Sequence, residues 1–150
     1  MEKNFEDYFS ELQTDMVSIC LEYIENKAEN IYIYGSYEPN AYYFNVFFRI
    51  EGKYVLKHQV NDNFSTPIYN TATDRQIGVQ RIGINDLEEI HKKCEEFNRE
   101  MPTEIKLYYN VKSNSLKGQY KYDLVYSNDN ELLPSDIFES WFEEVKKSSL

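Results

Sequence analysis

The sequence has no long apolar run, and its first residues carry no export signal. No stretch of the 150 residues approaches the length that a membrane-spanning helix requires. The segment from Met1 to Asp7 lacks both the basic start and the apolar stretch of a signal peptide. We therefore expect a protein that makes no membrane contact and resides in the cytoplasm.

Cysteine is scarce. The two cysteines, Cys20 and Cys94, have no CxxC neighbour and no spacing typical of metal ligands. Each falls on the apolar side of a predicted helix, where a free cysteine packs as a small hydrophobic residue. The sequence therefore predicts two free, buried thiols and no disulfide.

The motifs of common enzyme chemistries are also missing. Only five glycines occur, without a Gly-rich phosphate loop or a GxSxG motif. The two histidines belong to no HxH or HExxH pattern; we expect His58 to be partly buried on a strand and His91 to lie near the solvent edge of a helix. Asp129 and Glu131 could contact calcium, but the twelve-position calcium loop is absent. We expect no catalytic residue, metal or cofactor, and interpret the protein as not an enzyme.

Basic residues are absent from residues 122–145, which hold seven acids. Residues 1–29 hold eight acids against two lysines, whereas residues 30–121 are nearly neutral, with eleven acids and twelve bases. The chain carries a net charge of −10. This distribution favours a basic partner and disfavours direct nucleic-acid binding, which needs a basic surface.

Five acids of the C-terminal third form the candidate binding site: Asp129, Glu131, Asp136, Glu139 and Glu143. The last three lie at helical spacing of three and four, so they share one face of a predicted helix. Like charges so placed repel by only a few tenths of a kcal/mol per pair, so a solvated face that serves solubility would also explain them. The alternative is a surface where carboxylates meet the Lys and Arg side chains of a partner.

The residues that are present indicate one folded domain over residues 1–150. Hydrophobic residues make up 41% of the chain and aromatic residues 16%, which excludes general disorder. Fourteen tyrosines suit strands with one apolar and one wet edge. The length is that of a single core.

Hydrophobic periodicity predicts three helices. The first runs from Phe5 to about Lys27. The second begins at Asn85, where Glu88 completes a capping-box-like pattern, and ends near Met101 before a proline. The third begins at residue 135 or 136, with Trp141 on its inward side.

Alternating apolar residues predict two groups of strands. The first group comprises residues 31–34, ended by Gly35, then residues 42–50 and 54–60, joined by a hairpin turn at Glu51 and Gly52. The second is a hairpin of residues 105–111 and 120–126, and residues 61–83 are expected to be irregular. The fold class is therefore α+β, with helices packed on a mainly antiparallel sheet in the order α-β-β-β-α-β-β-α.

Two parts of the chain resemble the YezG-like immunity proteins. One is residues 121–129, continuing through Leu132-Leu133-Pro134 to residues 138–142; the other is residues 34–37 with residues 44–48 and Gly52-Lys53. The resemblance covers most of the chain in the same order of elements. It implies a bacterial antitoxin that binds the toxic C-terminal domain of a secreted polymorphic toxin, commonly a nuclease. The family has no established catalytic residues that could be transferred to this sequence.

Three hypotheses follow from these patterns. The first is an immunity protein that neutralises a basic toxin domain by stoichiometric binding, as a monomer or weak homodimer. The second is a small-molecule-binding or regulatory domain with a deep apolar cavity, and the third is a metal-dependent hydrolase in which several acids converge. For the first, residues 61–83 could make the contact instead of the acidic helix. Tyr37, Tyr126 and Trp141 are aromatic anchor candidates, although Trp141 is expected in the core.

Overall fold

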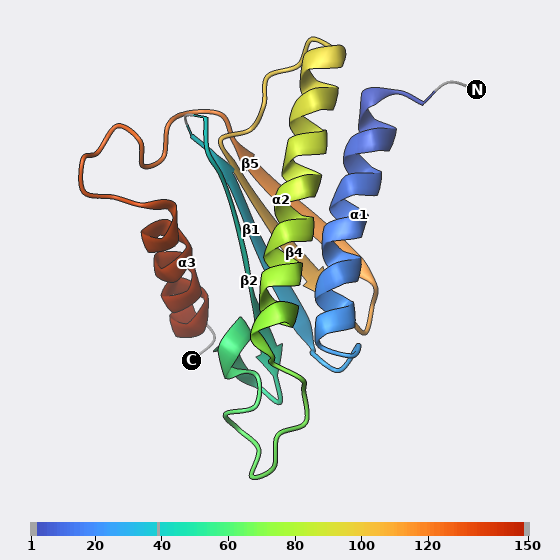
Figure 1. Cartoon of the computed structure of the whole chain (residues 1–150), viewed down its shortest axis with the longest axis vertical. Coiled ribbons are helices and arrows are strands. Elements are labelled where there is room, and N and C mark those ends of the chain that lie inside the picture. The colour runs from blue at the N-terminus through green and yellow to red at the C-terminus, as the bar shows by residue number, and fades with distance from the viewer. Residues whose placement is uncertain (1–2, 39, 149–150) are drawn as a thin grey trace.

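A five-stranded antiparallel sheet separates two helices on one face from one helix on the other (Figure 1). The computed structural model describes residues 3–38 and 40–148. The strands are β1 (Asn30–Tyr37), β2 (Tyr42–Ile50), β3 (Lys53–Leu56), β4 (Glu104–Asn110) and β5 (Ser115–Lys121). Their order in the sheet is β3-β2-β1-β4-β5, and every neighbouring pair is antiparallel. The α+β class and the predicted order of elements are confirmed.

Two cores lie on opposite faces of the sheet because the strands alternate. Phe44, Val46 and Phe48 of β2 belong to the larger core, which the sheet shares with α1 (Phe5–Tyr23) and α2 (Thr73–Glu96). Phe47 points the other way, into a smaller core against α3 (Pro134–Ser148). The alternation predicted for residues 42–50 is confirmed. Trp141 is buried in the smaller core, as expected.

Helix α1 begins as its sequence predicts and ends earlier. Asn4 caps the helix, and the side chains of Asn4 and Asp7 form a reciprocal capping box. The helix ends at Tyr23 rather than near Lys27, because Glu25 and Asn26 adopt φ angles of 52° and 60°. This left-handed conformation cannot continue a helix.

Helix α2 begins twelve residues before the predicted start, at Thr73 instead of Asn85. The expected helix start at Asn85 and Glu88 is wrong, because both residues lie inside the helix. Gly83, read from sequence as part of an irregular segment, is a contact point: a Cβ there would lie 2.3 Å from the Phe44 ring. The C-terminal end at Glu96 also precedes the predicted end. At Gly83, the close packing of α2 against Phe44 of β2 therefore outweighs the low helix propensity of glycine.

Three strand boundaries differ from their predictions. Gly35 continues β1 instead of ending it. The return strand stops at Leu56 and is followed by a 3-10 turn, Lys57–Gln59, which leaves His58 exposed rather than partly buried. Strand β5 ends at Lys121, so most of the predicted strand 120–126 is loop. The hairpin turn at Glu51 and Gly52 is confirmed, with φ angles of 49° and 79°.

Cys20 and Cys94 are free and buried, as predicted. Within residues 3–38 and 40–148, no helix combines the length and the apolar character needed to cross a membrane.

Candidate partner-binding surface

The outer face of α3 carries the densest part of the predicted acidic site. Because Phe138, Trp141 and Phe142 face the sheet, the acids on the opposite side of the helix point outward. Glu139 and Glu143 are exposed. A shallow hollow of about 550 Å³ is lined by Asp136, Glu139, Ser140, Glu143, Glu144 and Lys147. The expectation that Asp136, Glu139 and Glu143 share one face is confirmed.

The carboxylates of the acidic face are not paired with bases in the part of the chain that the structure describes. Among the described residues, none of the seven carboxylates in 122–145 forms a salt bridge. The other acidic end of the chain differs: Glu6 pairs with Arg99 at 3.3 Å and Glu11 with Lys3 at 3.0 Å. Glu2, counted with that end, lies outside the described residues. The negative charge of α1 is therefore partly offset by these pairs, whereas the described carboxylates of α3 have no salt bridge.

The two other predicted site residues lie on the loop that leads into α3. Asp129 is exposed, and its Oδ1 accepts a hydrogen bond of 2.8 Å from the backbone N–H of Glu131. Asp136 plays a similar local role, because its Oδ2 accepts from the backbone N–H of Leu133 at 2.8 Å. The structure therefore brings three of the five predicted acids to the hollow and places Asp129 and Glu131 beside the loop backbone.

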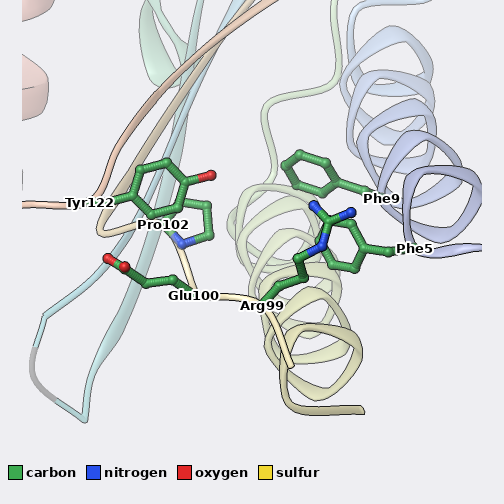
Figure 2. Close-up of a pocket in the computed structure, with 6 residues that line it drawn as sticks. All are labelled: Phe5, Phe9, Arg99, Glu100, Pro102 and Tyr122. Carbon is green, nitrogen blue, oxygen red and sulfur yellow. The ribbon is translucent and has the colours of Figure 1, made fainter. Parts of the chain in front are cut away.

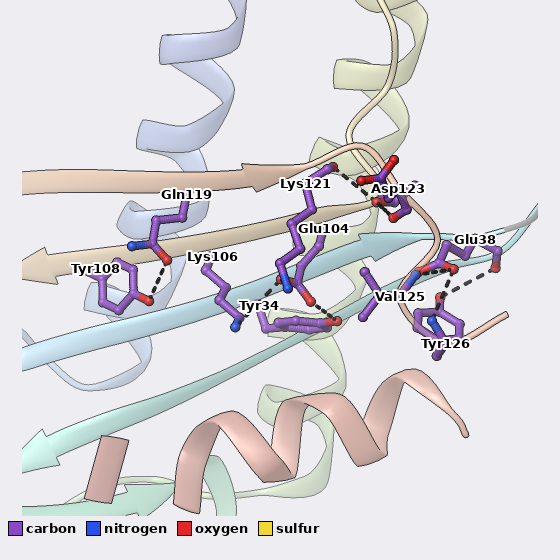
Figure 3. A network of polar contacts seen from close by, with 11 residues as sticks. Tyr34, Glu38, Glu104, Lys106, Tyr108, Gln119, Lys121, Asp123, Val125 and Tyr126 are labelled. Atoms are coloured by element: carbon purple, nitrogen blue, oxygen red, sulfur yellow. Dashed lines mark hydrogen bonds and ion pairs between the residues drawn. The ribbon is translucent and has the colours of Figure 1, made fainter. Parts of the chain in front are cut away.

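Glu38 is a residue that sequence reasoning missed. It follows β1, is only 3% exposed, and its carboxylate accepts backbone N–H bonds from Val125 and Tyr126 at 2.9–3.3 Å (Figure 3). The backbone N–H of Ser127 donates to the same carboxylate at 3.1 Å. The Ser127 hydroxyl donates a further bond of 2.7 Å. Burial alone would raise the pKa of Glu38, but these hydrogen bonds outweigh it and lower the pKa below its usual range. No sequence pattern links Glu38 to residues almost ninety positions later.

The aromatic anchor candidates lie elsewhere. Tyr126 is buried, and its hydroxyl lies 3.2 Å from Ser36 Oγ, so its side chain is not presented on the surface. Tyr37 packs against His91 of α2, with ring centroids 4.4 Å apart, on the opposite side of the sheet from α3. His91 is only partly exposed, and its Nδ1 atom lies 2.7 Å from the hydroxyl oxygen of Tyr42. These tyrosines belong to the packing of the fold.

A second buried glutamate, Glu104, lies close to Glu38 and has a structural role. Its Oε2 accepts from the Tyr34 hydroxyl at 3.1 Å, and Lys106 and Lys121 approach Oε1 at 3.7 Å each (Figure 3). Burial first, and then the charge of Glu104, raise the pKa of Tyr34. Tyr34, Lys106 and Lys121 therefore compensate the buried charge of the Glu104 carboxylate.

One pair of acids meets between the two helices of the larger core. Asp86 of α2 is 6% exposed, and its Oδ2 has no hydrogen-bond partner among the described residues. Burial first, and then the hydrogen bond and charge of Asp15, raise the pKa of Asp86 to about 8. In the described part of the chain, no three His, Cys, Asp or Glu side chains form a group that could hold a metal ion. The pair therefore bears on stability, and we assign it no metal.

Two further hollows relate to the small-molecule hypothesis. One, of about 260 Å³, lies between the start of α1 and the chain around Pro102; Figure 2 shows its aromatic walls, Phe5, Phe9 and Tyr122. Arg99 also lines it, with its guanidinium 4.6 Å from the Phe5 ring centroid. The other, of about 420 Å³, is lined partly by Arg49, Lys53, Tyr54, Asp62 and Lys146.

No protein-family model matches this chain, and no curated protein matches it.

Proposed function

We propose that this protein is a cytoplasmic immunity protein that neutralises a toxin domain by stoichiometric binding through the outer face of α3. The observation that carries the proposal is the acidic surface of α3, whose carboxylates have no salt-bridge partner among the described residues. The resemblance of residues 121–129, 132–134 and 138–142 to the YezG-like immunity proteins supports the same function.

The charge of the surface indicates the chemistry of the partner. A nuclease toxin carries basic surface to hold phosphates. An acidic protein can occupy that surface in place of nucleic acid, or dock beside it and block access. Carboxylates such as Glu139 and Glu143 would supply charge-assisted bonds to Lys and Arg, and their combined field would accelerate association. The expected partner is therefore a basic toxin domain.

Co-expression with the toxin domain encoded beside this chain tests the function directly. Survival of the cells, together with a one-to-one complex that weakens as salt is raised, is the expected result. If the toxin kills regardless and no complex forms at low salt, the immunity function is excluded. The hollow lined by Arg49 and Lys53 would then become the first place to examine for a small anionic ligand.

A pair of charge-reversed variants tests which acidic end binds. Glu139→Lys with Glu143→Lys should reduce the association rate at low salt by roughly tenfold or more, with less effect at high salt. Glu11→Lys with Glu22→Lys on α1 changes the net charge equally and should have a much smaller effect. Asp136 is left intact because it accepts the Leu133 N–H bond. Equal effects of the two pairs would show that overall charge, and not the α3 face, governs binding.

A further inference from the structure

We propose that residues 122–133, here named the leucine loop, dock into the basic face of the toxin domain and that Glu38 is the residue that positions them. This inference rests on the proposed function and identifies the apolar anchors of the same interface. Its basis is an exposed set of leucines on a loop whose backbone is held in place at several points.

The leucine loop exposes large apolar side chains. Leu124 is 55% exposed, Leu132 38% and Leu133 61%. Single exposed apolar residues are ordinary on protein surfaces, but several within twelve residues of irregular chain are not required by the fold. Protein interfaces bury an apolar centre inside a polar rim, and exposed leucines can supply such a centre.

The loop is held by hydrogen bonds along most of its length. At its start, the Thr103 hydroxyl donates to the carbonyl oxygen of Asp123 at 2.6 Å. The Glu38 carboxylate then holds residues 125–127, and the Asp129 backbone N–H donates to the Tyr126 carbonyl at 3.0 Å. Such a loop loses little conformational freedom on binding, so more of the contact energy becomes affinity.

The charge around the leucines determines the kind of partner. Asp123, Asp129, Glu131 and Asp136 flank them, and no base occurs from residue 122 to residue 145. Anionic membranes and nucleic acids would be repelled by this rim. A protein surface that combines Lys and Arg side chains with an apolar recess is complementary to it. The loop also runs directly into α3, so the leucines and the acidic hollow form one continuous stretch of chain.

Serine substitutions test the anchors. Leu124→Ser with Leu133→Ser should weaken binding of the toxin domain roughly tenfold or more, mainly through faster dissociation. The matched control is Ile68→Ser with Ile77→Ser, which removes two aliphatic side chains that are each 46% exposed elsewhere on the molecule. The control should bind within about twofold of the wild type.

Glu38→Gln tests the positioning role. The amide keeps the shape of the side chain but replaces an acceptor oxygen with a donor, so the backbone amides of residues 125–127 should exchange hydrogen faster while those of α1 and α2 do not. Dissociation of the toxin domain should accelerate, and the association rate, which depends on the α3 carboxylates, should stay unchanged. Faster exchange throughout the protein, or a change confined to association, would contradict a positioning role.

The wild-type protein separates the two proposals. If it forms no complex with the toxin domain, the proposed function fails and this inference fails with it. If it forms the complex and the leucine variant binds equally well, the leucine loop is not the docking segment and only this inference is overturned.

Discussion

Asp86 is the residue at which burial and charge conflict most directly. Its carboxyl group lies between α1 and α2, with Asp15 facing it from α1 and Glu89 adding negative charge from α2. Because the pKa of Asp86 is raised to about 8, the folded protein holds a proton that the unfolded chain releases near pH 4. The sign of the linkage follows: this group supports the folded state fully below about pH 4, and its contribution is lost as the pH rises through 8.

We therefore predict that Asp86→Asn makes the protein more stable at alkaline pH. The amide carries no charge to bury and can donate to the Asp15 carboxylate, so the gain at pH 9 should be roughly 1–3 kcal/mol and should shrink toward pH 4. Urea unfolding at several pH values measures it, with Asp74→Asn, an exposed position, as the control. Parallel pH profiles for the wild type and Asp86→Asn would show that Asp86 ionises normally.

At the scale of elements, α2 shows how packing can outweigh local preference. Gly78 and Gly83 both lie inside this helix, although glycine is a poor helix former. A Cβ at Gly83 would meet the Phe44 ring, whereas a Cβ at Gly78 would meet nothing within 4 Å. From the sequence, both glycines are predicted to lie in an irregular segment. The contact that explains Gly83 is with Phe44, on a strand about forty residues earlier, so no local pattern indicates it.

The two glycines provide a matched pair of substitutions. Gly83→Ala should destabilise the protein by about 1–3 kcal/mol, because the methyl group forces α2 away from β2. Gly78→Ala should stabilise it by about 0.5–1 kcal/mol through the higher helix propensity of alanine. Free energies of unfolding from urea titration give both values. Stabilisation by both substitutions would mean that α2 does not approach Phe44 as described.

At the scale of the whole molecule, the sheet joins two cores of unequal size. The smaller one depends on Phe47, which is fully buried with its ring centroid 5.0 Å from Trp141 and 5.1 Å from Phe142. Since Trp141 is the single tryptophan of the chain, its fluorescence reports on the α3 layer alone. The proposed binding face is the outer side of α3, so the packing of α3 on the sheet is needed for the proposed function.

We predict that the two layers unfold together. Urea transitions followed by Trp141 fluorescence and by far-UV circular dichroism should coincide, as they do for a single cooperative domain. Phe47→Ala should remove about 3–5 kcal/mol of stability, because it leaves a cavity beneath α3. A fluorescence transition at clearly lower urea than the dichroism transition in the wild type would instead identify α3 as an independently detaching element.

The sequence by itself determined the features that depend on neighbouring residues. The order of helices and strands, the inward side of α3 and the shared face of Asp136, Glu139 and Glu143 follow from periodicities of two or 3.6 residues. The turn at Glu51 and Gly52 follows from the positive φ that glycine tolerates. Such periodicities are local, so a single sequence carries them.

The tertiary structure decided what depends on distant residues. The start of α2 depends on its packing against β2. The pairing of Glu6 with Arg99 and the contact of Glu38 with Val125 join segments that local patterns cannot relate. The sequence shows that both ends of the chain are acidic. Only the fold shows that acids such as Glu6 are paired with bases, whereas the described carboxylates of residues 122–145 are not. The reason is physical: the free energy of these contacts comes from packing and hydrogen bonding between elements, which no local preference encodes.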